Sequence, residues 1–550
     1  MFNKEGIYFL PLGGADGIGL NLYVYAVDSK LVIVDVGYGF LSDDYPGMDL
    51  ALIDASFLET YQDSIEGLFI THVHEDHYGA IGHIWPKLKC PVYATQYASI
   101  LIKHRLKEFE LDKTVPIKIA KPEAEIKLKN FTVEFIPITH SAPESSAIFI
   151  KTKYGNIFHA TDWRFDDSCL KDKTTNYNTL ERIKKDGVEL FIGDSTNVLV
   201  DENNPTEEDI RKSLMELIPT LKNTVVATCF ASNTTRLESL VLAAHEAERT
   251  PILVGRSLKT HMATAKECGY FKDLPPCYDE FDAKDIPSDK ALYICTGSQG
   301  DYRSALPRII GGTHKGVKLS KGDSVIFSSK IIPGNEKKIE AMQDKLVGMG
   351  VTVISKETHL VHTTGHATKS ELIKMYNLLK PKIVIPVHGE RRFVQAHKEL
   401  ARFCGIKETI TTRCGDLILI KDGKAVLETE IPTTVLGCDR NQLTPLNSQL
   451  VKNRKRLAFN SSVYIGAVFD ENWNLDNIEI QSIDVLEEDE FNKLADEIIA
   501  KVKELLPSVI DKNRNKKSEV FEFLRSYIRK YIYNITGIKP VTFTHFFKRK

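Results

Sequence analysis

The sequence predicts an α/β protein that is divided into more than one domain. Its 550 residues exceed the roughly 250–300 residues that one hydrophobic core usually organises. Short apolar runs alternate with turn residues over the first two hundred positions, which is typical of strands. From about Pro205 such runs alternate with segments of helical periodicity. Alternating strands and helices favour an architecture in which helices pack on sheets.

The composition is that of an ordinary globular protein. Hydrophobic residues make up 42% of the chain and charged residues 27%, which excludes collagen-like, disordered and coiled-coil proteins. The formal net charge of −2 gives no overall basic field, so any site for a polyanion has to be local. The nine cysteines are scattered without a CxxC pair, which favours a reducing compartment. Because neither a signal-peptide pattern nor an apolar stretch of about 18 residues is present, we expect a cytoplasmic protein that does not contact a membrane.

Five apolar runs in the first region predict strands: residues 31–34, 68–70, 131–136, 157–158 and 190–192. Polar residues that can bind metals or move protons follow these runs directly: Asp35, His72 with His74, His140, Asp162 and Asp194. Much later, the run 383–387 is followed by His388 in the same way. Because sheet proteins place ligand sites where strands end, we expect these side chains to converge on one site.

The patterns after about Pro205 predict a doubly wound α/β block, with VVATCF, PILVG, ALYICTG and SVIFSS as strands. The run before His388 and the hairpin around Asp422 and Gly423 resemble the first region, so we interpret the block as an insertion into the first domain. The predicted organisation is therefore a first domain in two parts, an inserted domain, a linker and a small C-terminal α+β domain. Their ranges are 1–206 and 366–430, 207–365, 431–459 and 460–550.

The segment THVHEDH is the strongest signal for a metal site. It brings together His72, His74, Asp76 and His77, a pattern expected by chance on the order of once in a thousand such chains. In an extended chain, side chains two residues apart share a face, so His72 and His74 can reach one ion. If a helix begins near Asp76, then Asp76 and His77 can serve a second ion. A dinuclear site needs further ligands from distant strands, and His140, Asp162 and His388 are the candidates.

Imidazole and carboxylate ligands without thiolate suit zinc, with manganese as the alternative. A metal pair lowers the pKa of a bridging water toward neutrality and holds a phosphoryl or carbonyl oxygen, so the predicted chemistry is hydrolysis. Asp35 has two interpretations: a carboxylate that orients a ligand histidine, or a cap for the turn at the strand end.

The series of Asp35, the THVHEDH segment, His140 and Asp162 resembles the metallo-β-lactamase fold. The inserted block resembles the β-CASP subgroup of nucleic-acid hydrolases. PLGGADGIGLN, GDSTN, FASN, GRS, CTGSQG, IPGNE, HTTGH and PVHGE stand in the order and approximate spacing of bacterial ribonuclease J, and the tail FLRSYIRKYIYNITGIKP is similar to its C-terminal domain. The resemblance implies a metallo-β-lactamase αββα sandwich, an inserted β-CASP α/β domain and a small C-terminal α+β domain.

The resemblance also implies an activity: a cytoplasmic, zinc-dependent ribonuclease that acts in RNA maturation and decay. It would be a 5'-to-3' exonuclease that prefers a 5'-monophosphate and also acts as an endonuclease. A homodimer or homotetramer is implied, with the RNA-degradation machinery as a partner.

Carried over by resemblance, one ion would be held by His72, His74, His140 and Asp162. The other would be held by Asp76, His77, Asp162 and His388. His366 would protonate the leaving oxygen, and Asp194 would orient His366; a carboxylate beside an imidazole keeps it protonated. The implied substrate contacts are Phe230, Ala231, Ser232, Asn233, His362, Thr363, Thr364, Gly365 and His366.

Other functions remain compatible with parts of the sequence. The metal site alone also suits a DNA nuclease or a hydrolase of small molecules, although the inserted block and HTTGH argue against small molecules. A chain of this fold could also be a non-catalytic subunit of an RNA-processing assembly. The presence of all seven ligand candidates argues against that alternative.

Overall fold

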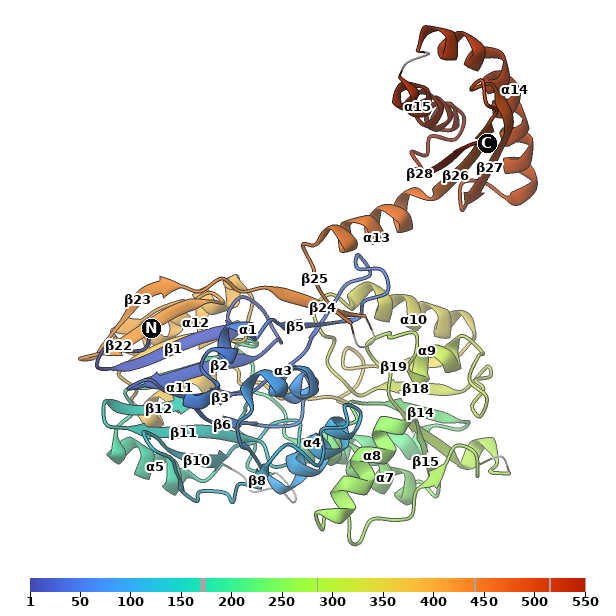
Figure 1. Ribbon diagram of the computed structural model, residues 1–550. Coiled ribbons are helices and arrows are strands. Elements are labelled where there is room, and N and C mark those ends of the chain that lie inside the picture. The colour runs from blue at the N-terminus through green and yellow to red at the C-terminus, as the bar shows by residue number, and fades with distance from the viewer. Residues whose placement is uncertain (169–174, 284, 440–441, 514–515, 550) are drawn as a thin grey trace. The chain divides into compact units, whose positions relative to one another are not determined.

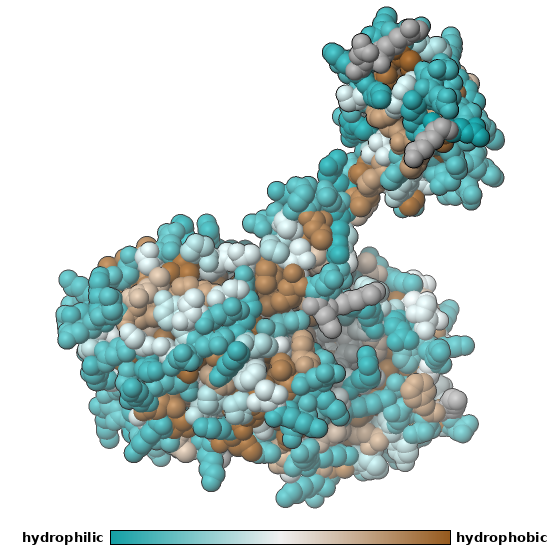
Figure 2. Space-filling view, viewed as in Figure 1, coloured by the Kyte–Doolittle hydropathy of each residue, from teal (hydrophilic) through white to brown (hydrophobic). Residues whose placement is uncertain are grey.

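A computed structural model describes residues 1–168, 175–283, 285–439, 442–513 and 516–549 (Figure 1). The chain forms two compact units, one of Met1–Phe40 with Ala51–Val435 and one of Leu41–Leu50 with Leu436–Lys550. On the face shown in Figure 2, hydrophilic residues dominate both units and apolar residues are scattered among them. The cysteines that the structure describes are free thiols, and Cys169 lies outside the described residues.

Two mixed β-sheets pack face to face in the first unit. One has the strand order β23-β22-β1-β2-β3-β6-β7-β8, with bounds β1 Ile7–Gly13, β2 Leu22–Val27, β3 Lys30–Val34, β6 Ile65–Phe69, β7 Val92–Ala94, β8 Ile117–Ile119, β22 Asp416–Lys421 and β23 Lys424–Glu430. The other has the order β21-β20-β13-β12-β11-β10-β9, with bounds β9 Ile126–Lys127, β10 Thr132–Pro137, β11 Ser146–Thr152, β12 Gly155–His159, β13 Leu190–Asp194, β20 Ile383–Val387 and β21 Glu408–Thr409. Buried residues of both sheets, such as Phe9, Tyr25, Phe135 and Ile385, form the core between them.

Helices cover the outer faces of this sandwich. Helices α5 (Tyr177–Asp186), α11 (Lys369–Leu379) and α12 (Arg391–Phe403) pack on the second sheet through a separate apolar cluster. Helix α4 (Gln96–Lys107) contacts β7 and β8 of the first sheet. The shorter helices are α1 (Ser56–Glu59), α2 (Glu75–Tyr78) and α3 (Ile81–Leu88). This is the predicted αββα sandwich, and β20, β22 and β23 show that the chain returns to it after the inserted block.

The inserted block contains a parallel sheet with the order β16-β15-β17-β14-β18-β19. Its strands are β14 Val225–Thr228, β15 Thr250–Val254, β16 Tyr278–Asp279, β17 Ala291–Cys295, β18 Ser324–Phe327 and β19 Thr352–Ile354. Its helices are α6 Glu207–Leu217, α7 Thr234–Glu246, α8 Arg256–Glu267, α9 Ala305–Ile310 and α10 Glu336–Gly348. A capping box between Thr206 and Asp209 begins α6. Because the strands are parallel, the loops after β14, β17 and β18 lie at one edge of the sheet.

The second unit contains a sheet with the order β27-β26-β28, packed on two helices. Their bounds are β26 Ser462–Phe469, β27 Leu475–Ile483, β28 Val541–Lys548, α14 Glu488–Lys512 and α15 Lys517–Thr536. These elements make a small α+β domain, as predicted. No helix among the described residues is long and apolar enough to cross a membrane.

The range 431–459, predicted as a linker, contains regular structure. It holds β24 (Val435–Asp439), β25 (Gln442–Pro445) and most of α13 (Gln449–Asn460). The side chain of Ser448 accepts a hydrogen bond from the Val451 backbone and caps α13. The basic run in α13 gives little apolar periodicity, and the sequence alone therefore does not predict this helix. Short strands β4 (Gly39–Phe40) and β5 (Leu50–Ile53) precede α1.

Candidate metal centre

The predicted metal ligands, together with Asp35 and Asp194, stand at or just after the ends of sandwich strands. His72 and His74 follow β6 in extended chain, with ψ of 144° at His74, and Asp76 and His77 lie in α2 directly after. The other candidates follow or end their strands: His140 after β10, Asp162 after β12, Asp194 in β13 and His388 after β20. Non-glycine residues rarely adopt positive φ, yet Asp35 and His388 have φ of 62° and 50°. Such backbone strain often marks functional sites.

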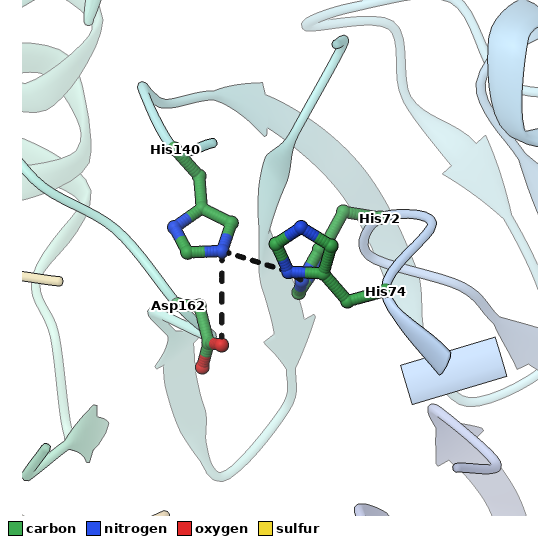
Figure 3. Close-up of side chains that lie close together, drawn as sticks. All are labelled: His72, His74, His140 and Asp162. Carbon is green, nitrogen blue, oxygen red and sulfur yellow. Dashed lines mark hydrogen bonds and ion pairs between the residues drawn. The ribbon is translucent and has the colours of Figure 1, made fainter. Parts of the chain in front are cut away.

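The first cluster consists of His72, His74, His140 and Asp162, whose ligand atoms all lie within 4.8 Å of one another (Figure 3). His74 Nδ1 lies 3.2 Å from His72 Nε2 and 3.0 Å from His140 Nε2, and Asp162 Oδ2 lies 3.8 Å from His140 Nε2. Tetrahedral zinc with bonds of about 2.0–2.1 Å holds its ligand atoms about 3.4 Å apart. The donor atoms therefore fit a single transition-metal ion.

The second cluster consists of Asp76, His77, Asp162 and His388. Asp76 Oδ2 lies 3.3 Å from His388 Nε2, and Asp162 Oδ2 lies 3.3 Å from His77 Nε2. His388 Nδ1 lies 2.6 Å from Asp162 Oδ1, and both of these atoms and His388 Nε2 are buried. Two imidazoles and two carboxylates that converge in a largely buried place are ligands of the types that zinc binds. This donor set favours a metal here, and Asp162 is common to both clusters.

Neighbouring groups fix the ligand rings. Asp35 accepts from His77 Nδ1 at 2.7 Å, and also from the Thr71 backbone N at 2.9 Å and Thr71 Oγ1 at 2.8 Å. Both interpretations of Asp35 are therefore compatible with its contacts. His140 Nδ1 donates to the Gly365 carbonyl at 2.6 Å, which leaves Nε2 free to bind a metal.

The two clusters differ in their electrostatics. Burial lowers the pKa of His74 to about 4, so this imidazole is neutral near pH 7 and ready to bind a cation. Burial also opposes the charge on His388, but the carboxylates of Asp162 and Asp76 outweigh it and raise its pKa to about 10 in the absence of metal. A cation that binds the second cluster therefore has to displace protons.

His366 and Asp194 form a pair beside the clusters. His366 Nδ1 donates to Asp194 Oδ2 at 2.8 Å and lies 3.9 Å from Asp162 Oδ2. Burial raises the pKa of Asp194, but the charge of His366 outweighs it and the net shift is downward. Asp194 is held by Thr196 as well, through N at 2.8 Å and Oγ1 at 2.6 Å. The geometry is that of a carboxylate which orients an imidazole.

The loops predicted to bind substrate lie on the inserted block and near His366. Asn233 Oδ1 accepts from the Arg236 backbone N at 2.9 Å and caps α7. His362 is largely buried, both its ring nitrogens lack partners among the described residues, and burial together with Arg236 and Lys330 holds its pKa well below the usual range. A neutral imidazole beside cations is suited to an anionic ligand.

Three residues that the sequence analysis missed hold this region together. Asn197 Nδ2 donates to Thr364 Oγ1 at 3.0 Å and to the His366 carbonyl at 3.1 Å. Arg164 Nη1 donates to Thr363 Oγ1 at 2.6 Å, and Lys330 Nζ donates to Asn197 Oδ1 at 2.6 Å. Asn197 ends the GDSTN motif and Arg164 lies two positions after Asp162, so proximity to motifs was the available signal for them. Lys330 lies two positions before IPGNE, so the same signal was available for it.

Comparison with known proteins identifies the family. Three family models match: the ribonuclease J β-CASP domain at residues 222–346, the Zn-dependent metallo-hydrolase RNA specificity domain at 334–412 and the β-lactamase superfamily domain at 42–179. Ribonuclease J of Sinorhizobium meliloti is 33% identical over 548 residues, which cover 98% of this chain and 97% of that protein. The chain belongs to the ribonuclease J family. It is a metal-dependent RNA nuclease.

Other relatives agree with this assignment. Ribonuclease J 1 of Streptococcus pyogenes is 32% identical over 86% of this chain and 84% of its own. Ribonuclease J of Mycolicibacterium smegmatis is 35% identical over 73% of this chain and 72% of its own. A solved structure of a protein of unknown function from Enterococcus faecalis V583 matches with a TM-score of 0.53 and 17% identity, covering 75% of this chain and 100% of that one, which supports the fold alone. The predicted fold class and hydrolysis of RNA are thus confirmed.

Proposed function

We propose that this ribonuclease uses two zinc ions, with manganese as the alternative. It acts as a 5'-to-3' exonuclease that prefers a 5'-monophosphate and also cuts internally, in RNA maturation and decay. One observation carries the two-metal assignment: Asp162 belongs to both ligand clusters, with Oδ2 facing His140 and His77 and Oδ1 lying 2.6 Å from His388 Nδ1. Family membership supports the activity, since the relatives named above are ribonucleases J.

The protein residues have distinct tasks in this proposal. When bound, two divalent ions at such a site lower the pKa of bound water and stabilise charge on phosphoryl oxygens. The metal ligands are His72, His74, His140, Asp162, Asp76, His77 and His388. Asp35 holds His77 and the Gly365 carbonyl holds His140, so neither ring has to reorient when a cation binds.

His366 is the proton donor to the leaving 3' oxygen. Its Nδ1 is committed to Asp194, so the proton would come from Nε2. A 3' oxyanion is a poor leaving group unless it is protonated, and the Asp194 carboxylate orients the imidazole that would supply this proton.

Residues 230–233 and 362–366 bind the substrate phosphates in this proposal. Support comes from the ring of His362, whose nitrogens have no hydrogen-bond partner among the described residues, and from the small hydroxyl residues Ser232, Thr363 and Thr364, which allow a phosphate to approach the backbone.

Cleavage of one labelled RNA tests the activity. The RNA carries a 5'-monophosphate, 5'-triphosphate or 5'-hydroxyl and is incubated with zinc or manganese, with a chelator as control. We expect mononucleotides from the monophosphate form, and no product with chelator. Internal fragments alone would reject the exonuclease, and cleavage that survives chelation would reject the metal centre.

We also propose the assembly and location of the protein. It would act in the cytoplasm as a homodimer or homotetramer that works with the RNA-degradation machinery. Its domains would be 1–206 with 366–430, 207–365 and 460–550, although 431–459 contains the elements β24, β25 and α13. Light scattering on the purified full chain gives the oligomeric state. A monomer at micromolar concentration would reject the proposed homodimer or homotetramer.

A further inference from the structure

Most cations around the HTTGH segment are already neutralised by protein groups. Arg236 contacts the Glu207 carboxylate at 3.0 Å and also donates to Ser328 and to the Val361 carbonyl. Arg164 is paired with Asp166 and donates to Thr363. Both guanidinium groups are buried. Their contacts explain how the loops are held, and they leave little positive charge for a ligand.

Lys330 is different. Its ammonium donates one hydrogen bond, to Asn197 Oδ1 at 2.6 Å, and the described residues provide no other hydrogen-bond acceptor for it. An ammonium has three donor hydrogens, so donors remain for a ligand. The side chain is half-buried, and burial lowers the pKa of Lys330 although Asp194 nearby favours its charge. A cation with spare donors in a partly dehydrated place is suited to an anion.

The backbone around Lys330 is fixed independently of its side chain. Gln299, from the loop after β17, donates Nε2 to the Lys330 carbonyl at 2.8 Å and accepts from the Ile332 backbone N at 2.9 Å. These two hydrogen bonds hold the segment from which the Lys330 side chain extends. Such preorganisation lowers the entropic cost of binding.

Asn197 connects Lys330 to the residues of the proposed phosphate site. The amide that accepts from Lys330 donates to Thr364 Oγ1 at 3.0 Å and to the His366 carbonyl at 3.1 Å. Lys330 thus lies one side chain away from both the hydroxyl and the proton donor that act on substrate in the proposed function. A phosphate held by Thr364 would be within the reach of a neighbouring ammonium.

We propose that Lys330 binds the 5'-terminal phosphate of RNA and thereby determines the preference for a 5'-monophosphate. The inference rests on the proposed function, because it requires a 5'-end preference to exist. A terminal monophosphate carries nearly two negative charges at pH 7, whereas an internal phosphodiester carries one. A lysine with free donors would therefore bind the terminal monophosphate more strongly than it binds an internal phosphodiester.

The test compares two RNAs of one sequence, with a 5'-monophosphate or a 5'-hydroxyl, in the full-length metal-loaded enzyme. We expect Lys330→Met to raise KM for the monophosphate RNA about tenfold or more, the loss typical of a hydrogen bond to a charged group. KM for the hydroxyl RNA should rise about twofold at most. The slope of log affinity against log salt for the monophosphate RNA should fall in magnitude by about 0.7. Lys330→Arg should restore most of the preference, and Lys345→Met on the exposed face of α10 is the matched control.

Each outcome decides between the proposals. If the wild-type enzyme treats both RNAs alike, the 5'-end preference and the role of Lys330 both fail. If the wild type prefers the monophosphate and Lys330→Met keeps that preference, or weakens both RNAs equally, only the role of Lys330 fails. Should Lys330→Met not fold, acylation of Lys330 in the wild type gives a second test. A 5'-monophosphate oligonucleotide, but not its 5'-hydroxyl form, should protect the lysine, as read by mass spectrometry.

Discussion

Two sets of strand ends meet different demands in this molecule. The sandwich edge, made of Asp35, residues 72–77, His140, Asp162, Asp194 and His388, buries most of its polar side chains; His72, Asp162 and His388 are 1%, 2% and 3% exposed. The inserted-sheet edge, made of the loops 229–233, 296–304 and 328–335, keeps Ser232 and Lys330 half-buried. Both edges use the carboxyl ends of strands, yet the sandwich edge buries more of its functional groups than the inserted-sheet edge does.

The difference follows from the chemistry each edge has to support. Metal ligands need fixed positions and a low dielectric, and they stabilise charge only where water is largely excluded. A chain of phosphates has to slide in from solvent, so its binding groups have to stay accessible. We therefore expect substitutions at the sandwich edge to lower kcat and substitutions at the inserted-sheet edge to raise KM.

Asp162→Asn should have the largest effect, because its carboxylate serves both ligand clusters. Loss of several kcal/mol of charge stabilisation predicts a fall in kcat of at least about 1,000-fold, with loss of bound metal. Activity assays and elemental analysis of the purified protein measure both. His104→Ala, on the exposed side of α4, is the matched control. A variant that kept its bound metal and its kcat would show that Asp162 is not a metal ligand.

His366→Ala should lower kcat by about 100-fold or more, the usual contribution of a positioned proton donor. KM and metal content should change little, because the substitution removes the donor and leaves both metal clusters with their ligands. The competing interpretation is specific: Asp162, Asp194, His366 and His388 also lie close enough to hold an ion. Loss of metal in His366→Ala would favour that third cluster over a proton donor.

Asp35→Asn should weaken metal binding or activity by about 10–100-fold, as is typical for groups that orient a ligand. The amide can still accept from Thr71 but loses the charge that faces His77 Nδ1. Calorimetric titration of metal into the metal-free protein measures the affinity. Equal metal affinity in the variant and the wild type would mean that Asp35 caps the turn at the strand end and does not orient a ligand histidine.

The sandwich edge was predictable because its residues are rare types that directly follow strands. Histidine and aspartate after a buried run have few structural uses, and the two-residue spacing of His72 and His74 predicts that both can reach one ion in an extended chain. Lys330 and Asn197 could not be found this way. Their contacts join residues 133 and 167 positions apart, and lysine or asparagine on a loop is common. Only the folded chain shows which of them meet.

The smallest predicted effect is at Ser232 on the inserted-sheet edge. Ser232→Ala removes one neutral hydroxyl from the loop that precedes α7 and leaves the cap formed by Asn233 in place. A lost neutral hydrogen bond is worth about 0.5–1.5 kcal/mol, so we expect KM to rise about 2–12-fold while kcat stays near the wild-type value. Ser213→Ala on α6 is the control, and steady-state kinetics on the 5'-monophosphate RNA is the measurement. A fall in kcat without a change in KM would contradict the division between the edges, because it would mean that the inserted sheet takes part in the chemical step.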